Sequence, residues 1–102
     1  MVTDLMLYSR IEAAARVADV ELVRVDTPQQ VPPDADLVLV DWSNRRPHWT
    51  DGLRDLQARV ILFGPHTDLE AHADARAAGL GPMWARSKLV AELPSLFVQV
   101  RT

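Results

Sequence analysis

Two short apolar runs, at residues 37–40 (LVLV) and 60–63 (VILF), constrain the fold of this chain more than any other feature. Runs rich in leucine and β-branched residues, bounded by turn-forming residues, are typical of parallel strands that are buried on both faces. Leu53 and Leu56 lie between the runs at helical spacing, behind Thr50, a residue type that caps helices. A strand, a helix and a strand in this order predict an α/β fold with a parallel sheet.

Three further segments extend this alternation. Residues 5–8 (LMLY) form an apolar run that we interpret as a first strand, and residues 20–25 (VELVRV) alternate as a half-exposed edge strand does. Residues 83–85 (MWA) have the length of a last short strand. Five strands in 102 residues predict a single flavodoxin-like three-layer domain, with a parallel sheet in the order 2-1-3-4-5.

The segments between the expected strands have helix signals. Ser9 stands where the N-cap of a helix over residues 11–18 belongs, and Thr67 opens a capping box before an alanine-rich helix over residues 68–78. Ser87 is expected to cap a final helix. The connection over residues 26–35 holds three prolines in ten residues, so we expect the second helix to be vestigial.

Length, charge and cysteine content exclude several classes of protein. The chain fits one domain over residues 1–102, and its lack of cysteine excludes disulfide scaffolds and cysteine-based zinc sites. No apolar run reaches the ~18 residues of a membrane span, and the first residues lack the basic start of a signal peptide. The net charge of −3 disfavours nucleic-acid binding. We therefore expect a cytoplasmic protein with neither a nucleic-acid nor a membrane partner.

The carboxyl ends of the expected strands are the places where a site is expected. Ligands of open parallel sheets bind at this edge, near the point where the strand order reverses. The residues at the strand ends include one acidic, one basic and several hydroxyl or imidazole side chains: Ser9, Asp41, His66, Thr67, Arg86 and Ser87. We expect an ion pair between Asp41 and Arg86.

Three segments of the chain resemble parts of the receiver domains of response regulators. The run from Asp36 to Asp41 looks like the third strand of that family, which ends in the phospho-accepting aspartate. Residues 60–63 resemble the fourth strand, and residues 77–79 (AAG), followed by a short strand and Arg86, resemble the approach to the end of the fifth. The resemblance implies a flavodoxin-like fold, a role in signal transduction, and Asp41 as the candidate phospho-acceptor.

The family's other phosphorylation residues are missing from this sequence. Tyr8 and Ser9 fall where receivers have the acidic pair that holds Mg²⁺, a cation that requires oxygen ligands. Gly64 replaces the family's Ser or Thr, and Arg86 replaces its Lys. The chain therefore resembles a degenerate receiver, or pseudo-receiver, that aspartyl phosphorylation does not switch. A receiver that is still phosphorylated at Asp41 is one alternative.

A second alternative is a small-ligand or anion-binding domain. Ser9, His66, Thr67 and Ser87 would then form a ligand edge together with Asp41 and Arg86, because free N–H groups at helix starts favour anions. Enzyme chemistry is disfavoured: Ser9 lacks the G-x-S-x-G turn of hydrolases, and the sequence contains no Walker or dinucleotide glycine motif. The three histidines match no zinc-ligand spacing. We therefore expect no catalytic residues, no cofactor and no metal.

The segment after Asp41 is a candidate partner-binding loop. Trp42, Arg45, Arg46 and Trp49 belong to residue types that are enriched at binding hot spots. If the loop binds a partner, both indoles are expected to be exposed. The two alanine-rich helices would also permit a homodimer. The sequence thus predicts a stand-alone receiver-like module for signalling or protein interaction, with an unidentified protein partner.

Overall fold

Within the part of the chain that the structure describes, three parallel strands form one sheet in the order β1-β2-β3. The computed structural model describes residues 5–101, with the side chains of residues 5–100. The strands and α-helices, in chain order, are α1 (Leu5–Ala18), β1 (Leu37–Asp41), α2 (Trp49–Arg54), β2 (Arg59–Gly64), α3 (Leu69–Ala77), β3 (Trp84–Ala85) and α4 (Arg86–Arg101). Two single turns of 3₁₀ helix complete the elements, η1 (Pro28–Gln30) and η2 (Trp42–Asn44).

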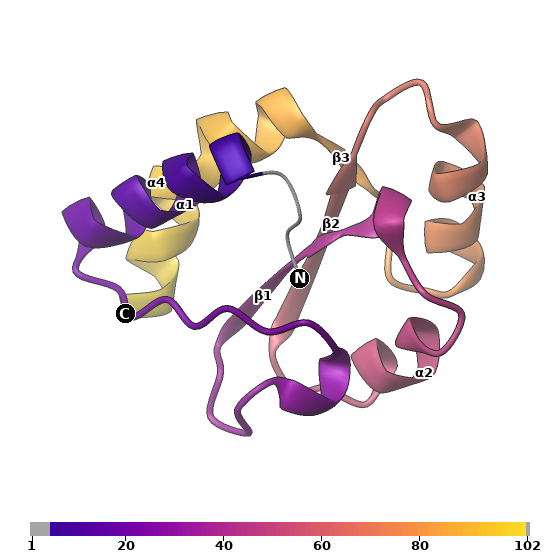
Figure 1. Cartoon of the computed structure of the whole chain (residues 1–102), viewed down its shortest axis with the longest axis horizontal. Coiled ribbons are helices and arrows are strands. Elements are labelled where there is room, and N and C mark those ends of the chain that lie inside the picture. The colour runs from indigo at the N-terminus through magenta and orange to yellow at the C-terminus, as the bar shows by residue number, and fades with distance from the viewer. Residues whose placement is uncertain (1–4, 102) are drawn as a thin grey trace.

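Helices cover both faces of the sheet, so the fold has three layers (Figure 1). Side chains alternate along a strand, and Ile61 and Phe63 of β2 therefore pack against α1 and α4, while Leu62 packs on the opposite face, with α2 and α3. All three residues are buried. The apolar runs at residues 37–40 and 60–63 are thus buried parallel strands, as the sequence predicted.

The predicted first strand at residues 5–8 is wrong, because these residues begin α1. Leu7, Ile11 and Ala15 are four residues apart, and this spacing places them on one face of a helix, where all three are buried. The exposed side chains of Leu5 and Met6 lie on the other side of the same helix. The apolar run LMLY is therefore the start of an amphipathic helix.

The predicted edge strand at residues 20–25 is also wrong, since this segment pairs with no strand among the described residues. Its alternation is nevertheless real: Val20 and Leu22 pack with α1 and α4, whereas Val25 packs in the cluster on the opposite face of the sheet. The sheet of residues 5–101 thus has three strands in the order β1-β2-β3, which overturns the five-stranded order 2-1-3-4-5.

The expected vestigial helix is the single turn η1, which starts at Pro28. Helices α3 and α4 differ from the sequence predictions in their first residues. Asp68, and not Thr67, caps α3, because its carboxylate accepts a hydrogen bond from the backbone N–H of Ala71 at 3.1 Å. Helix α4 begins at Arg86, one residue before Ser87. Within the part of the chain that the structure describes, no helix combines the length and apolar character needed to cross a membrane.

Candidate functional site

The carboxyl ends of the three strands bring Asp41, Gly64 and Arg86 to one edge of the sheet. Asp41 is the last residue of β1 and Gly64 the last of β2, while Arg86 directly follows β3. The parallel register pairs Asp41 with Phe63, and Gly64 with Ala85, so the three positions are adjacent across the sheet. This edge is where the sequence predicted a site.

The carboxylate of Asp41 is enclosed by its neighbours. Its side chain is only 1% exposed. Its Oδ2 atom lies 3.8 Å from Nη2 of Arg86 and accepts a hydrogen bond of 2.8 Å from Nδ2 of Asn44. The Arg86 side chain is 42% exposed, so the ion pair joins a buried carboxylate to a partly exposed guanidinium. The structure therefore contains the expected Asp41–Arg86 ion pair and adds Asn44 as a second partner.

Gly64 leaves room for the side chains that fill the middle of this edge. A Cβ atom at position 64 would lie 2.7 Å from Oγ of Ser43 and 3.1 Å from Sδ of Met83. Because Met83 is buried and Ser43 is half-buried, neither can move away without loss of contacts. The position above β2 is therefore occupied by the protein's own side chains.

Substitution Gly64→Ala is expected to destabilise the protein by about 1–3 kcal/mol, the usual cost of overpacking. Urea unfolding measures the change. Replacing Ser43 by Ala in the same chain removes the Oγ atom that the new Cβ would meet but also its hydrogen bond to Asp68, so the double variant should lose less stability than the two single variants added together. Strictly additive effects of the two substitutions would contradict this account, because residues in contact are expected to couple.

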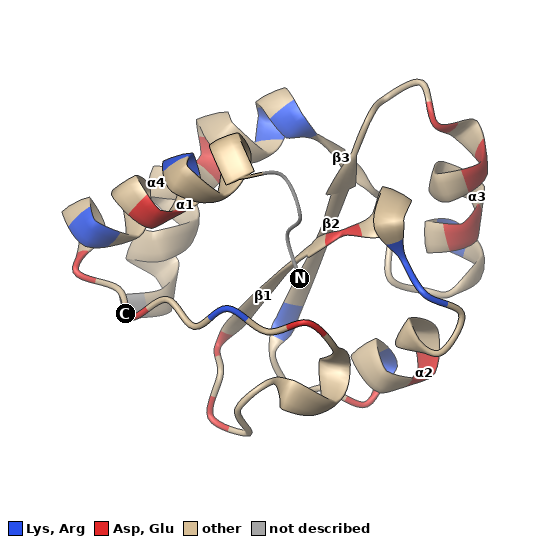
Figure 2. Cartoon of the chain, in the orientation of Figure 1, with Lys and Arg blue, Asp and Glu red and all other residues tan. Residues whose placement is uncertain are grey.

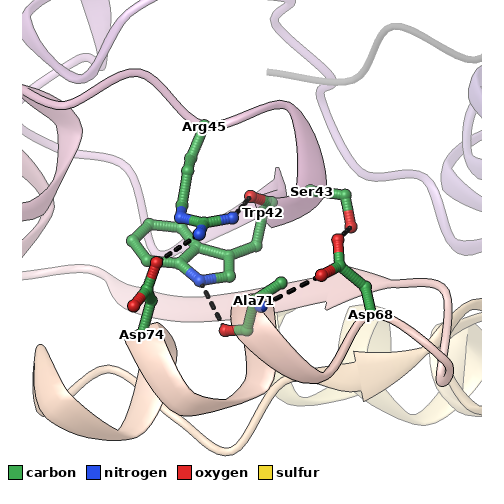
Figure 3. Close-up of polar contacts among 6 residues, drawn as sticks. All are labelled: Trp42, Ser43, Arg45, Asp68, Ala71 and Asp74. Atoms are coloured by element: carbon green, nitrogen blue, oxygen red, sulfur yellow. Dashed lines mark hydrogen bonds and ion pairs between the residues drawn. The ribbon is translucent and has the colours of Figure 1, made fainter.

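Trp42 of the turn η2, and Arg45 directly after it, contact helix α3 (Figure 3). Nε1 of Trp42 donates a hydrogen bond of 3.0 Å to the carbonyl oxygen of Ala71, and the indole is only 1% exposed. Arg45 lies over the Trp42 ring at 5.3 Å and forms an ion pair with Asp74 of α3. We call these four residues the Trp42 clasp. They join the end of β1 to the helix that follows β2.

A second link joins the same two elements. Oγ of Ser43 donates a hydrogen bond of 3.0 Å to Oδ2 of Asp68, the residue that caps α3. The backbone N–H of Ala71, followed by the hydroxyl of Ser43, holds the pKa of Asp68 below its ordinary value, because both donors favour the ionised carboxylate. Asp68 therefore stabilises the fold in its charged form.

A group whose pKa is lower in the folded than in the unfolded protein stabilises the fold above its unfolded pKa. That contribution is lost as the pH falls through the folded pKa. Asp68→Asn, which keeps a capping side chain but removes the charge, should therefore be less stable than the wild type at pH 7, and the difference should shrink toward pH 3. Urea midpoints across this range measure it. Asp34→Asn is the control, since Asp34 has no polar partner among residues 5–101. An unchanged difference at low pH would contradict the role of Asp68.

The predicted partner loop is folded back onto the protein. Trp42 and Trp49 are 1% and 5% exposed, so the expectation of two exposed indoles is wrong. Arg45 forms an ion pair with Asp74, whereas Arg46 is exposed. The reason is that α3 offers hydrogen-bond and charge partners 29 residues further along the chain, which no local pattern in the loop reveals.

The predicted ligand edge is not assembled. Ser9 lies inside α1 and is exposed, because residues 5–8 are helical rather than a strand. His66 and Thr67 are exposed in the loop before α3, and Ser87 is exposed in the first turn of α4. Across residues 5–101, no three His, Asp or Glu side chains converge on a point that could hold a metal ion. Sequence reasoning missed Asn44 and Asp68. The only signal for Asn44 was its position three residues after Asp41, and the only signal for Asp68 was its position three residues before Ala71.

Comparison with known proteins adds no relative. No protein-family model matches the chain, and neither the curated proteins nor the solved structures contain a match to it. The site's own geometry therefore carries the functional argument.

Proposed function

We propose that this protein is a protein-interaction module that works without an aspartyl-phosphate switch. The enclosure of Asp41 is the observation that supports the absence of the switch, and the open edge of β1 among the described residues, not the Trp42–Trp49 loop, is the surface that supports an interaction role. A phospho-accepting carboxylate must offer an oxygen to the phosphoryl group and share the site with Mg²⁺. At 1% exposure, with Oδ2 contacted by Arg86 and Asn44, the Asp41 carboxylate acts instead as a structural anchor at the end of β1.

The neighbouring positions support the same proposal. The space above Gly64 holds Ser43 and Met83, so the position next to Asp41 on β2 is filled by the protein's own side chains and not left open to a phosphoryl group. Tyr8 and Ser9 lie on α1 and supply no carboxylate for a metal ion. Within this proposal, the resemblance to receiver domains means a signalling module whose former acceptor aspartate has become part of the structure.

An NMR titration tests the proposal. Backbone amide spectra are recorded with Mg²⁺ alone and then with Mg²⁺ and beryllium fluoride, which mimics an aspartyl phosphate. We expect no saturable shifts at Asp41, Gly64 or Arg86. Shifts centred on Asp41 that disappear in the Asp41→Asn variant would overturn the proposal and support a receiver that is still phosphorylated.

A further inference from the structure

One backbone edge of strand β1 is covered by no other strand of residues 5–101. The N–H of Arg59 in β2 donates to the carbonyl of Asp36 at 3.0 Å. In a parallel ladder alternate residues bond to the same neighbour, so Val38 and Val40 also face β2. Leu37 and Leu39 therefore direct their N–H and C=O groups to the opposite side. These groups have no hydrogen-bond partner among the described residues.

Residues 20–25 form a stretch without regular secondary structure between α1 and η1 (Figure 1). This stretch lies on the side of the molecule to which Leu37 and Leu39 direct their backbone groups. Its side chains alternate between the two apolar clusters, with Leu22 toward α1 and α4 and Val25 on the other face. Alternation of this kind places the segment level with the sheet. Like Leu37 and Leu39, the residues Glu21, Leu22 and Val23 have no backbone partner within residues 5–101.

A cavity of about 540 Å³ separates this segment from β1. All six residues of the segment line it on one side and residues 36–39 on the other, with Ile11 of α1 and Phe97 of α4 also in the lining. Backbone groups without a protein partner must be paired by water or by another chain. A cavity that is bordered by Leu37 and Leu39 on one side and by Glu21, Leu22 and Val23 on the other, whose backbone groups have no partner within residues 5–101, matches the surroundings of one additional strand.

We infer that this cavity, which we call the β1 slot, accepts an extended apolar segment of a partner protein as an added strand beside β1. Main-chain hydrogen bonds to Leu37 and Leu39 would supply affinity, as in other cases of strand addition. The inference rests on the proposed function and specifies the partner's chemistry. Because helices or loops cover both faces of the sheet here, the guest residues should be apolar on both sides, with valine and isoleucine preferred.

The charges around the β1 slot specify one end of the guest. Asp34 and Asp36 line the cavity just before β1 begins. Asp19 and Glu21 line it beside the end of α1. Arg24 is the one basic residue among the described residues that line the cavity. Figure 2 shows acidic residues on the loop that leads into β1. A guest parallel to β1, like the other strands, would bring its amino end to Asp34 and Asp36. One or two Lys or Arg residues at that end would complement the acidic lining.

Titration of the full chain with a capped peptide, Lys-Lys-Val-Ile-Val-Val, tests the inference by hydrogen exchange and NMR. In the free protein the amides of Leu37 and Leu39 should exchange fast, whereas Val38 and Val40 are protected by β2. The peptide should slow exchange at Leu37 and Leu39 alone. Protection of both amides without peptide would overturn the inference, because the edge would then already be paired by this chain or by a second copy.

Two peptides and one variant serve as controls. N-methylation of alternate peptide residues should weaken binding at least about tenfold, since it removes the pairing donors, and moving the lysines to the carboxyl end should weaken it several-fold. Leu37→Pro removes the N–H donor that faces the slot, at a strand-initial position that tolerates proline, and should weaken binding more than Leu37→Ala, which truncates the packed side chain but keeps the donor. Undiminished binding in any of these three would contradict the inference.

The outcomes for the slot and for the proposed function remain separate. A peptide that fails to bind, together with a silent beryllium fluoride titration, overturns the β1 slot and leaves the module without an aspartyl-phosphate switch. Shifts at Asp41 with beryllium fluoride overturn the proposed function, whatever the peptide does.

Discussion

Replacing Trp42 by Ala is expected to lower the free energy of unfolding by about 3–5 kcal/mol, the largest loss for any single substitution considered for this protein. The indole is 1% exposed and packs in the cluster between the sheet and helices α2 and α3. Its removal leaves a cavity and also breaks the hydrogen bond to the Ala71 carbonyl. Arg45 loses the ring over which it lies and is less well held against Asp74.

Urea unfolding followed by circular dichroism measures this effect. Trp42→Phe separates packing from hydrogen bonding, because it keeps an aromatic ring but loses the Nε1 donor, and should cost less than the alanine variant. Trp84→Phe is the matched control, since Trp84 is only half-buried and carries Lys88 over its ring. If Trp42→Ala costs no more than Trp84→Phe, the Trp42 clasp does not stabilise the fold as described.

Arg86→Ala is expected to cost about 1–3 kcal/mol. Removing one partner of a fully buried ion pair costs about 3–5 kcal/mol, because the other charge stays behind in the protein. Here the loss is smaller, since the Arg86 side chain is 42% exposed, the two charged groups are 3.8 Å apart, and Asn44 keeps its hydrogen bond to Asp41. Water that enters beside Asp41 in the variant offsets a further part of the lost stability.

A double-mutant cycle with Asp41→Asn isolates the pair. If Arg86 stabilises the protein through the Asp41 charge, its removal should cost much less when Asp41 is already neutral. Arg46→Ala is the control, because Arg46 is exposed and forms no ion pair in the described part of the chain. Equal costs for Arg86→Ala in both backgrounds would show that the contribution of Arg86 is independent of Asp41.

The parts of the fold that could be predicted are those decided by short-range patterns. The runs at residues 37–40 and 60–63 are buried parallel strands because their composition leaves no polar face. The alanine-rich segment forms α3 within one residue of the predicted bounds. In these elements local propensity and burial favour the same structure.

The errors arise where a pattern fits two structures. The run LMLY is too short to distinguish a strand from the start of a helix, and the spacing of Leu7 with Ile11 and Ala15 decides for the helix. Residues 20–25 have the alternation of a strand, but a strand also needs a paired neighbour, and this depends on the whole chain. The five-stranded order failed at these two segments.

The candidate site could be predicted only in part, because some of its contacts join residues that are far apart in the sequence. Asp41 ends β1 and Arg86 directly follows β3, the strands on either side of β2, so the carboxyl ends of the parallel strands place both residues at one edge of the sheet. The folded-back Trp42 loop could not be predicted, because its partners Ala71 and Asp74 lie on α3, 29 residues further along the chain, and no local pattern marks them as partners of the loop.

The packing of α1 against α4 has a consequence for the order of folding. Leu7 and Phe97 belong to the same cluster, although about 90 residues separate them. At a synthesis rate of ~5–20 residues per second, the ribosome needs about 5–20 s to make that stretch. Until α4 is made, the apolar stripe of α1 has no helix to cover it, whereas β1, β2 and α3 are complete once residue 77 has been added. The half of the core that contains the Trp42 clasp is therefore expected to fold first, and α1 is the element most exposed to chaperones and proteases in the nascent chain.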